Sequence, residues 1–372
     1  MAWLAGWSYR KEIDVQDAYV DGDLTDFPLY VKRTADADLA EALATGYDIR
    51  FTQSDGETLL YYEREAWAGG NGSAATADFW VRVPSIAATG GANIFMYYGK
   101  ADAPDGQDSA NTWDSSFECV LHMKDDPDTS TVQDSTSHGV DGTKKGANEP
   151  VEASGKIEQG QQFDGTNDYI SGSIAELFRA AKTFSCWLYR TAADQFAFAN
   201  IGPNLSNIAP QTLAHVYASG GLGSFGIKNG GGYDYLDSVE TVSTDAWHHL
   251  VFLDDLNPAQ GYHLYLDGAE CTYTVGSQGA YIDYTNTSNY LYLGGGYDNQ
   301  YGTGILDEVR ISSVARSAAW IKFEYRNVAE ADNELTWGEE ESEGPPPAFF
   351  LYPGIFDQLR GGLSAYTGGL KT

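Results

Sequence analysis

The chain has 372 residues and a formal net charge of −31. Acidity of this size repels polyanions, and the adjacent basic pairs lie in no longer basic run, so nucleic acid is excluded as a partner. No stretch approaches the ~20 apolar residues that a membrane-spanning helix needs, which excludes a membrane span.

Length and composition predict more than one domain, all of the β class. The usual size of a domain gives two or three for this length. Short runs of apolar, β-branched and tyrosine residues recur between clusters of Gly, Asp, Asn and Ser, and long amphipathic helices are missing. We therefore expect an all-β protein of two β-sandwich domains with an extended C-terminal tail.

Residues 1–110 are predicted to form the first β-sandwich, because alternating runs are joined there by turns. The predicted strands are Tyr9–Val15, Phe27–Val31, Tyr47–Phe51, Leu59–Glu65, Phe79–Val83 and Ile94–Tyr98. The ordered motifs GWSYRKEIDV, DIRFTQSDG, FWVRVP and IFMYYGKADA resemble an uncharacterised bacterial surface-protein domain that commonly precedes a laminin-G-like module. This resemblance implies a fold and a neighbouring module but no chemistry.

Residues 111–337 are predicted to form the second sandwich. Strands are expected at 119–124, 184–189, 247–253, 262–267, 290–293 and 305–311, and a short helix or turn at 317–327. The motifs LHMK, DSTSHG, FDGTNDYI, FSCWLYR, WHHLVFL, YLDGAE and GILDEVRISSVARS resemble the concanavalin A-like, laminin-G-like (LamG) jelly rolls. The resemblance implies two stacked antiparallel sheets, one of them concave and often used for binding.

The three cysteines form an odd set without a paired short spacing, so zinc and a redox pair are not indicated. We interpret Cys119, Cys186 and Cys271 as buried free thiols in preference to a disulfide.

Catalysis is not indicated, although concanavalin A-like folds also include glycoside hydrolases. Those enzymes need two carboxylates, typically on alternate positions of one strand. Glu63 and Glu65 come nearest to this pattern, and we interpret them as solvated residues of an edge strand. His248 and His249 are adjacent, so on a strand they point to opposite faces and do not converge on one ligand. We expect one to be buried and hydrogen-bonded and the other exposed.

Calcium is the cofactor that the jelly-roll resemblance implies, near the rim of the sandwich. Its candidate ligands by resemblance are Asp134, Asp164, Asp168 and Asp307, because Ca²⁺ prefers carboxylate and carbonyl oxygens. Each has an alternative role. Asp134 can cap a turn, Asp164 can serve a β-turn, and Asp307 can pair with an arginine such as Arg310 or Arg316.

Glycan binding is the ligand function predicted for the second domain. Aromatic faces stack on sugar C–H surfaces, while amides and carboxylates bind the hydroxyls. The alternatives are a protein-binding surface and no ligand at all. The candidate residues in the Tyr-rich loops are Tyr233, Tyr235, Tyr281, Tyr284, Tyr297, Asp298, Asn299 and Tyr301.

Residues 338–372 are predicted to form an acidic, Pro-rich linker and an apolar docking tail. The segment GEEESEG precedes three prolines, and the apolar residues after them are too few for a core of their own. We expect residues 345–372 to dock on a larger protein assembly in which the chain is oligomeric. A disordered end is the alternative.

The start of the chain lacks the basic residues and apolar core of a secretory signal. Together these features predict a non-catalytic carbohydrate-binding or adhesion protein. We expect it to be made in the cytoplasm without a cleavable signal peptide and to act on a virion or extracellular surface, for instance as a phage tail or capsid-fibre protein. The alternatives are a structural decoration or fibre subunit with protein contacts only, and a polysaccharide hydrolase.

Overall fold

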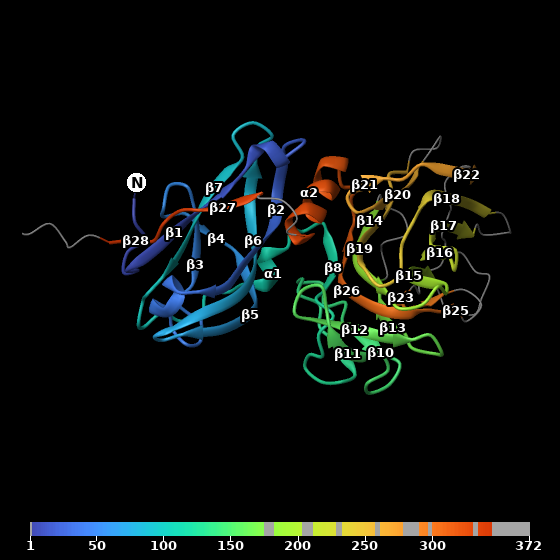
Figure 1. The fold of residues 1–372 in the computed structure, drawn as a ribbon, viewed down its shortest axis with the longest axis horizontal. Coiled ribbons are helices and arrows are strands. Elements are labelled where there is room, and N and C mark those ends of the chain that lie inside the picture. Colours follow the sequence, from blue (N-terminus) through green and yellow to red (C-terminus); the bar gives the residue numbers. More distant parts are fainter. Residues whose placement is uncertain are drawn as a thin grey trace, which may run out of the picture.

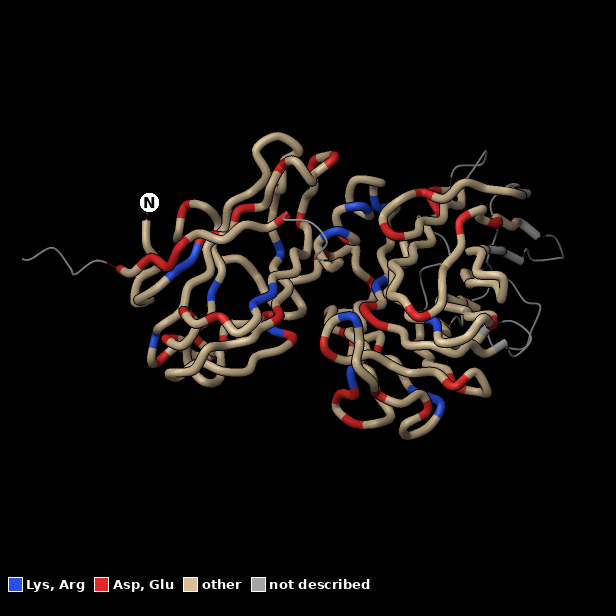
Figure 2. The backbone as a smooth tube through the Cα atoms, in the orientation of Figure 1, with Lys and Arg blue, Asp and Glu red and all other residues tan. Residues whose placement is uncertain are grey.

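The fold was analysed in a computed structural model, which describes residues 2–174, 182–202, 211–227, 233–256, 261–277, 290–296, 300–329 and 334–343. It is nearly all β, as predicted, and forms two lobes side by side (Figure 1). Acidic positions are spread over both lobes, in keeping with the net charge (Figure 2). None of the described helices is long and apolar enough to cross a membrane.

The first lobe is built from two antiparallel sheets. The strands of its six-stranded sheet are β27 (Leu335–Trp337), β1 (Tyr9–Val15), β7 (Ala92–Tyr98), β3 (Arg50–Gln53) and β4 (Leu59–Leu60) in order, with β28 (Glu341–Ser342) also on β1. The three-stranded sheet has the order β2 (Leu24–Asp36), β6 (Ser73–Ile86) and β5 (Tyr62–Gly70). The short helices of this part of the chain are η1 (Asp17–Tyr19), η2 (Asp38–Glu41) and α1 (Ser109–Thr112).

The second lobe is a jelly roll of two facing sheets. Its nine-stranded sheet has the order β22 (Tyr273–Ser277), β18 (Tyr233–Thr241), β17 (Gly221–Ile227), β16 (Gln211–Val216), β15 (Phe196–Gly202), β23 (Tyr290–Leu293), β13 (Ile170–Ser173), β10 (Gly142–Lys144) and β9 (Thr131–Val132). The eight-stranded sheet has the order β11 (Val151–Ser154), β12 (Gln159–Asp164), β26 (Thr303–Ser312), β14 (Lys182–Arg190), β19 (Trp247–Asp254), β20 (Tyr262–Leu266) and β21 (Ala269–Glu270), with β8 (Phe117–Leu121) also on β26. A small ribbon pairs β24 (Gly295–Gly296) with β25 (Gln300–Tyr301).

The core of the jelly roll lies between these two sheets. Strand periodicity turns every second side chain inward, so Phe184 and Phe252 from one sheet meet Phe198 and Leu291 from the other in one buried cluster. All three cysteines are buried as free thiols, and burial raises the pKa of each. Their expected place in the core is confirmed.

Strands β27 and β28 differ from the predicted division of the chain. Residues 335–337 were assigned to the jelly roll and residues 338–343 to a linker, yet both strands pair with β1 of the first lobe. Ile13 lies opposite Trp337, and Arg10 lies opposite Glu341, with which it forms a salt bridge of 2.7 Å. The chain therefore returns to its first sheet after completing the jelly roll.

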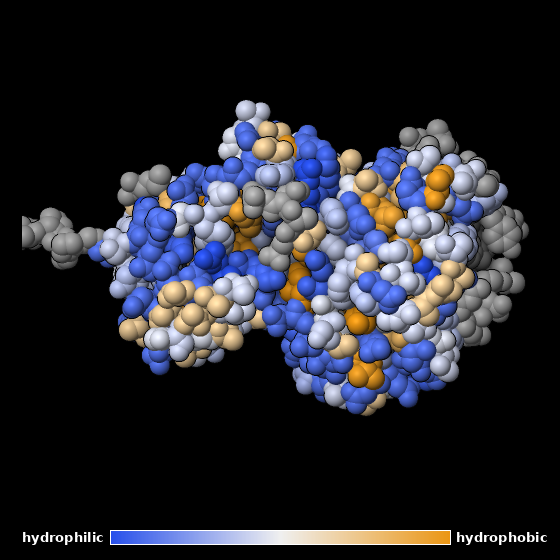
Figure 3. All heavy atoms as spheres, viewed as in Figure 1, coloured by the Kyte–Doolittle hydropathy of each residue, from blue (hydrophilic) through white to orange (hydrophobic). Residues whose placement is uncertain are grey.

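Helix α2 (Ala318–Ala329) lies between the two lobes, at the predicted position (Figure 1). Its Trp320 ring packs on Phe27 of β2 at a centroid distance of 4.7 Å. Asn327 accepts a hydrogen bond from the backbone N–H of Tyr30 at 2.7 Å and donates one to its carbonyl at 3.0 Å. The core of the first lobe continues through this contact, since Trp113, Phe117, Trp187 and Trp320 belong to its buried cluster. Apolar residues are also visible at the waist between the lobes (Figure 3).

Candidate functional site

His122 lies at the junction of the two lobes, immediately after β8. Its side chain is 2% exposed, and the next residue, Met123, has a φ of 55°. This left-handed backbone conformation is uncommon for a residue with a side chain and turns the chain sharply at the end of the strand. His122 is thereby held between the jelly-roll sheet and β5 of the first lobe.

Glu308 reaches His122 from a β-bulge in β26. The register between β26 and β14 shifts at this point, and Glu308 has a φ of 49°. In a regular strand Asp307 and Glu308 point to opposite faces, but a bulge can redirect a side chain. Both residues are buried here, with exposures of 0% and 1%.

Glu63 and Glu65 approach His122 from the first lobe. Strand β5 has its own register shift between Arg64 and Ala66, so Glu65 also lies on a bulge. The Glu63 side chain is 10% exposed and the Glu65 side chain 1%. The prediction that these two carboxylates are solvated is wrong, because the jelly roll covers the face of β5 that carries them.

The four side chains form one contact network around the imidazole ring. The His122 Nδ1 atom lies 2.7 Å from Glu308 Oε1 and 3.5 Å from Glu65 Oε2. The Nε2 atom lies 3.3 Å from Glu63 Oε2. Glu63 also accepts hydrogen bonds from Trp113 Nε1 at 2.8 Å and from Ser135 Oγ at 2.7 Å.

Arg310 extends the network toward helix α2. Its guanidinium binds Glu308 Oε2 at 2.7 Å and Glu324 Oε1 at 2.9 Å. The same group lies over the Trp80 ring, 4.1 Å from its centroid, and the indole N–H of Trp80 donates to Glu65 Oε2 at 2.7 Å. Carboxylates from both lobes are thus joined by buried, charge-assisted contacts.

The protonation of the network follows from burial and neighbouring charge. Burial disfavours a charged His122, but Glu308, Glu65 and Glu63 outweigh it and raise the pKa of His122 well above its ordinary value. Burial alone would raise the pKa values of Glu63 and Glu308, yet the facing His122 lowers both. Burial dominates at Glu65 and raises its pKa to about 8.

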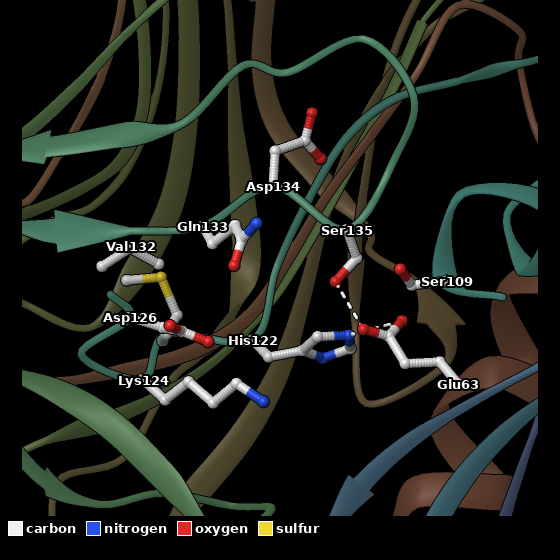
Figure 4. Close-up of a pocket in the computed structure, with 10 residues that line it drawn as sticks. Glu63, Ser109, His122, Lys124, Asp126, Val132, Gln133, Asp134 and Ser135 are labelled. Carbon is white, nitrogen blue, oxygen red and sulfur yellow. Dashed lines mark hydrogen bonds and ion pairs between the residues drawn. The ribbon is translucent and has the colours of Figure 1, made fainter. Parts of the chain in front are cut away.

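A small cavity of ≈ 90 Å³ adjoins this network (Figure 4). His122 and Glu63 lie side by side at its wall, together with Ser135, Asp134 and Lys124. A space of this size holds water rather than a sugar, since ligand pockets usually measure roughly 300–1,000 Å³.

The predicted calcium ligands are placed separately, and within the described residues they form no group of three converging donors. Asp134 is buried, and four donors occupy its carboxylate: the N–H groups of Val120, Thr136 and Val140 and the hydroxyl of Thr136, at 2.8–3.0 Å. These bonds match its alternative role as a turn cap.

The carboxylates of the other three predicted ligands accept hydrogen bonds from backbone N–H groups. Asp164 and Asp168 share one turn, in which Asp168 accepts from the Asp164 N–H at 3.0 Å. Asp307 accepts from the N–H of Ile157 at 2.9 Å, and burial raises its pKa well above the ordinary value. Its suggested arginine partners bind elsewhere: Arg310 as described, and Arg316 to Asp114 at 3.2 Å. Calcium stays a prediction.

The predicted glycan-binding residues are only partly described. Tyr235 is exposed on β18, and Tyr301 is half-buried on β25. Tyr233 begins β18, but its side chain is not described. The remaining candidates lie outside the described residues, namely Tyr281, Tyr284, Tyr297, Asp298 and Asn299.

An open groove of ≈ 390 Å³ lies near one end of the nine-stranded sheet, where β10, β13 and β23 run side by side. Tyr290 of β23 is 40% exposed at this groove. The hydroxyl residues Thr143, Ser171 and Ser173 and the carboxyl residue Asp141 line it as well. The sequence prediction did not include this groove, because it favoured tyrosines in Gly-rich segments over Tyr290 at the start of a strand.

The two adjacent histidines lie on opposite faces of β19, as predicted. His249 is 1% exposed and His248 is half-buried. The imidazole hydrogen bonds are made by His248: its Nδ1 atom lies 2.8 Å from Asp267 Oδ2, and its Nε2 atom lies 2.8 Å from Ser243 Oγ. The expectation that the buried histidine is the hydrogen-bonded one is therefore not met by the side-chain contacts.

Comparison with known proteins agrees with this architecture. The family described as the concanavalin A-like lectin/glucanases superfamily matches residues 164–322, and a domain of unknown function, DUF2341, matches residues 45–135. A search of curated proteins found no match.

Several solved structures are similar to the chain. The binding domain of Paraclostridial Mosquitocidal Protein 1 has a TM-score of 0.44 and 14% identity, over 57% of this chain and 52% of that one. Domain 4 of the arabinanase AbnA from Geobacillus stearothermophilus, in complex with arabinotriose, has a TM-score of 0.42 and 17% identity. The match covers 56% of this chain and 97% of that domain. The receptor-binding domain of a botulinum neurotoxin mosaic serotype C/D has a TM-score of 0.42 and 13% identity. The match covers 57% of this chain and 50% of that one. The match to the first and third spans about half of their length.

The order of motifs, the two facing sheets and the family match all identify the second lobe. Residues 164–322 thus match the concanavalin A-like lectin/glucanases superfamily, and residues 45–135, upstream of them, match DUF2341.

Proposed function

We propose that the protein is a non-catalytic carbohydrate-binding protein, and that its jelly roll binds a glycan in the groove beside Tyr290. The observation that carries this proposal is the exposed Tyr290 ring at an open groove of ≈ 390 Å³. The groove has the size of a ligand site, and it belongs to a lobe of the lectin/glucanase superfamily.

The groove has the chemical groups that sugar recognition uses. The Tyr290 ring offers an apolar face for sugar C–H groups. Thr143, Ser171 and Ser173 offer hydroxyls that donate or accept, and Asp141 offers a carboxylate. These residues lie on neighbouring strands, since Thr143 pairs with Ser171 and Ser173 pairs with Tyr290. A strand framework keeps such groups in fixed positions.

The carboxylates favour binding over hydrolysis. Among the described residues that line the groove, Asp141 is the one carboxylate, whereas glycoside hydrolysis usually requires two. Glu63 lines a cavity of only ≈ 90 Å³ at the lobe junction, where a sugar ring has no room, and Glu65 is buried against His122 beside it. A polysaccharide hydrolase is therefore the less favoured function.

A surface role follows as the finer part of the proposal. A glycan-binding lobe suits display on a virion or cell surface, and the predicted docking segment 345–372 would attach it to a larger assembly. That segment lies outside the described residues, so its support is the sequence pattern alone.

A glycan array with the full chain, in calcium and in chelator, tests the proposal. Tyr290→Ala is expected to abolish binding, whereas Tyr235→Ala, an exposed tyrosine on β18 of the same sheet, is the matched control and is expected to retain it. The reverse result would place the site at Tyr235 on β18. A folded chain that binds no glycan under either condition would contradict the proposal and favour a structural subunit.

A further inference from the structure

We propose that Glu65, His122 and Glu308 form a binding site for one divalent transition-metal ion, with Zn²⁺ as the probe, at the junction of the two lobes. This group is independent of the proposed glycan groove. It joins one carboxylate of the first lobe to an imidazole and a carboxylate of the jelly roll.

The donor atoms have the spacing that a metal ion requires. Glu65, His122 and Glu308 each present one ligand atom, and these atoms lie within 4.8 Å of one another. Ligands that each lie roughly 2.0–2.2 Å from a tetrahedral zinc ion are separated from one another by about 3.4 Å. The distances from His122 Nδ1, 2.7 Å to Glu308 Oε1 and 3.5 Å to Glu65 Oε2, bracket that separation.

The surrounding groups orient all three ligands. A metal-bound histidine usually directs its second ring nitrogen at a carboxylate or carbonyl, and His122 Nε2 faces Glu63 at 3.3 Å. Glu63 is itself fixed by Trp113 and Ser135. Arg310 holds the oxygen of Glu308 that faces away from the imidazole. The ligands are thus supported by a second layer of polar contacts.

The charge of the network favours a cation. Carboxyl groups of Glu63, Glu65, Glu308 and Glu324 outnumber the basic groups that they face in this buried space, namely Arg310, His122 and His249. Ionised buried carboxylates are costly unless they are paired or coordinate a metal. A divalent ion held between Glu65 and Glu308 would take the place of the proton on His122 Nδ1 and keep both carboxylates paired with positive charge.

The donor set selects the class of ion. One imidazole nitrogen and two carboxylate oxygens suit Zn²⁺ or Mn²⁺, whereas Ca²⁺ and Mg²⁺ prefer oxygen ligands alone. The adjoining cavity of ≈ 90 Å³, walled by His122 and Glu63, has room for water beside the network. The same residues without a metal would form an ion-pair network, and the experiment must separate these two states.

The test starts from the full chain after treatment with a chelator and its removal. Equilibrium dialysis against ZnCl₂, MnCl₂ or CaCl₂, followed by elemental analysis, measures the bound metal, and thermal unfolding gives a second readout. The proposal expects one Zn²⁺ per chain, weaker Mn²⁺, no stoichiometric Ca²⁺ at this site, and a melting temperature that rises with Zn²⁺ concentration.

Glu65→Gln is the decisive variant, because the amide keeps an acceptor for Trp80 Nε1 and so preserves the fold while losing the charged ligand. It is expected to lose stoichiometric Zn²⁺. Glu63→Gln, next to the second ring nitrogen, is expected to weaken Zn²⁺ by roughly 10–100-fold. His263→Gln is the matched control, because His263 also lies between two carboxylates, Asp255 and Glu270, but on the surface.

Loss of Zn²⁺ in Glu65→Gln with retention in His263→Gln would support the site. Two results would overturn it: a folded wild-type chain that binds no Zn²⁺ or Mn²⁺ stoichiometrically, or binding that Glu65→Gln leaves unchanged. Retention in Glu65→Gln with loss in His263→Gln would assign the metal to the surface histidine.

Discussion

The lobe junction and the open groove use opposite kinds of side chain. At the junction, buried charges from β5, β8, β26 and α2 hold one another, and two of the carboxylates sit on β-bulges. In the groove, an exposed aromatic ring and small hydroxyl residues line regular strands. The two regions should therefore respond to different substitutions. At the junction, a substitution that unbalances the buried charges should lower stability, whereas in the groove a substitution that removes the exposed aromatic ring should lower binding.

The largest expected effect is at the junction. Arg310→Met leaves Glu308 and Glu324 without their shared partner in a buried environment, which should cost roughly 3–5 kcal/mol of unfolding free energy. Denaturant unfolding measures it. Arg82→Met, which removes a partly exposed pair with Asp26, should cost below about 1 kcal/mol. Equal losses in the two variants would show that the junction network is no more important than a surface pair.

Asn327→Ala probes the helix that separates the lobes. The change removes the two buried hydrogen bonds that the Asn327 side chain makes to the N–H and C=O of Tyr30, which should cost roughly 1–3 kcal/mol. Asn93→Ala, which removes an exposed bond to Glu12, is the control and should change stability little. A neutral Asn327→Ala would mean that α2 is held by its aromatic contacts alone.

Asp78 of β6 accepts a hydrogen bond from the Tyr30 hydroxyl, faces Glu158 and gives stability a pH dependence. Burial raises its pKa from 3.8 to about 6, with Glu158 adding to the rise and Tyr30 and Lys32 opposing it. Between these values Asp78 binds more protons in the folded state than in the unfolded state, so its contribution to stability is present at low pH and is lost as the pH rises through about 6.

Asp78→Asn should flatten the slope of unfolding free energy against pH. The measurement covers about two pH units on either side of the raised pKa of Asp78. Glu57→Gln, an exposed carboxyl of the same lobe, should leave the slope unchanged. An Asp78→Asn chain whose slope equals that of the wild-type chain would contradict the role assigned to Asp78.

The smallest effect on stability is expected in the groove. Tyr290→Ala truncates a side chain that is 40% exposed, so the unfolding free energy should change by roughly 0.5 kcal/mol or less while glycan binding is lost. Denaturant unfolding alongside the array measures both. A loss of several kcal/mol would place Tyr290 in the core rather than in a binding surface.

Much of the fold could be predicted from the sequence because strand periodicity reports which face is buried. The runs Tyr9–Val15 and Ile94–Tyr98 form strands, and the segment after β26 forms a helix. The pairing of β27 and β28 with β1 was not predictable. These strands are too short for their sequence pattern to indicate which strand they pair with.

The junction network was hidden for a related reason. Glu63 and Glu65 alternate on one strand, which is the pattern of a solvated face until another lobe covers it. One signal was present: DEVR places three charges inside a core strand, and charges in such a position need partners. The bulges at Glu65 and Glu308 that bring these charges to His122 are set by tertiary packing, and neither position carries a glycine to mark it.

The pairing of β27 and β28 with β1 also bears on how the chain is made. Since the first sheet includes residues from both the start and the end of the described chain, the jelly roll is an insertion into the first lobe. During synthesis the outer edge of β1 must wait, uncovered, until the inserted lobe has left the ribosome. The jelly roll can therefore complete its own core first, and closure of the first sheet becomes a late step that brings the two lobes together.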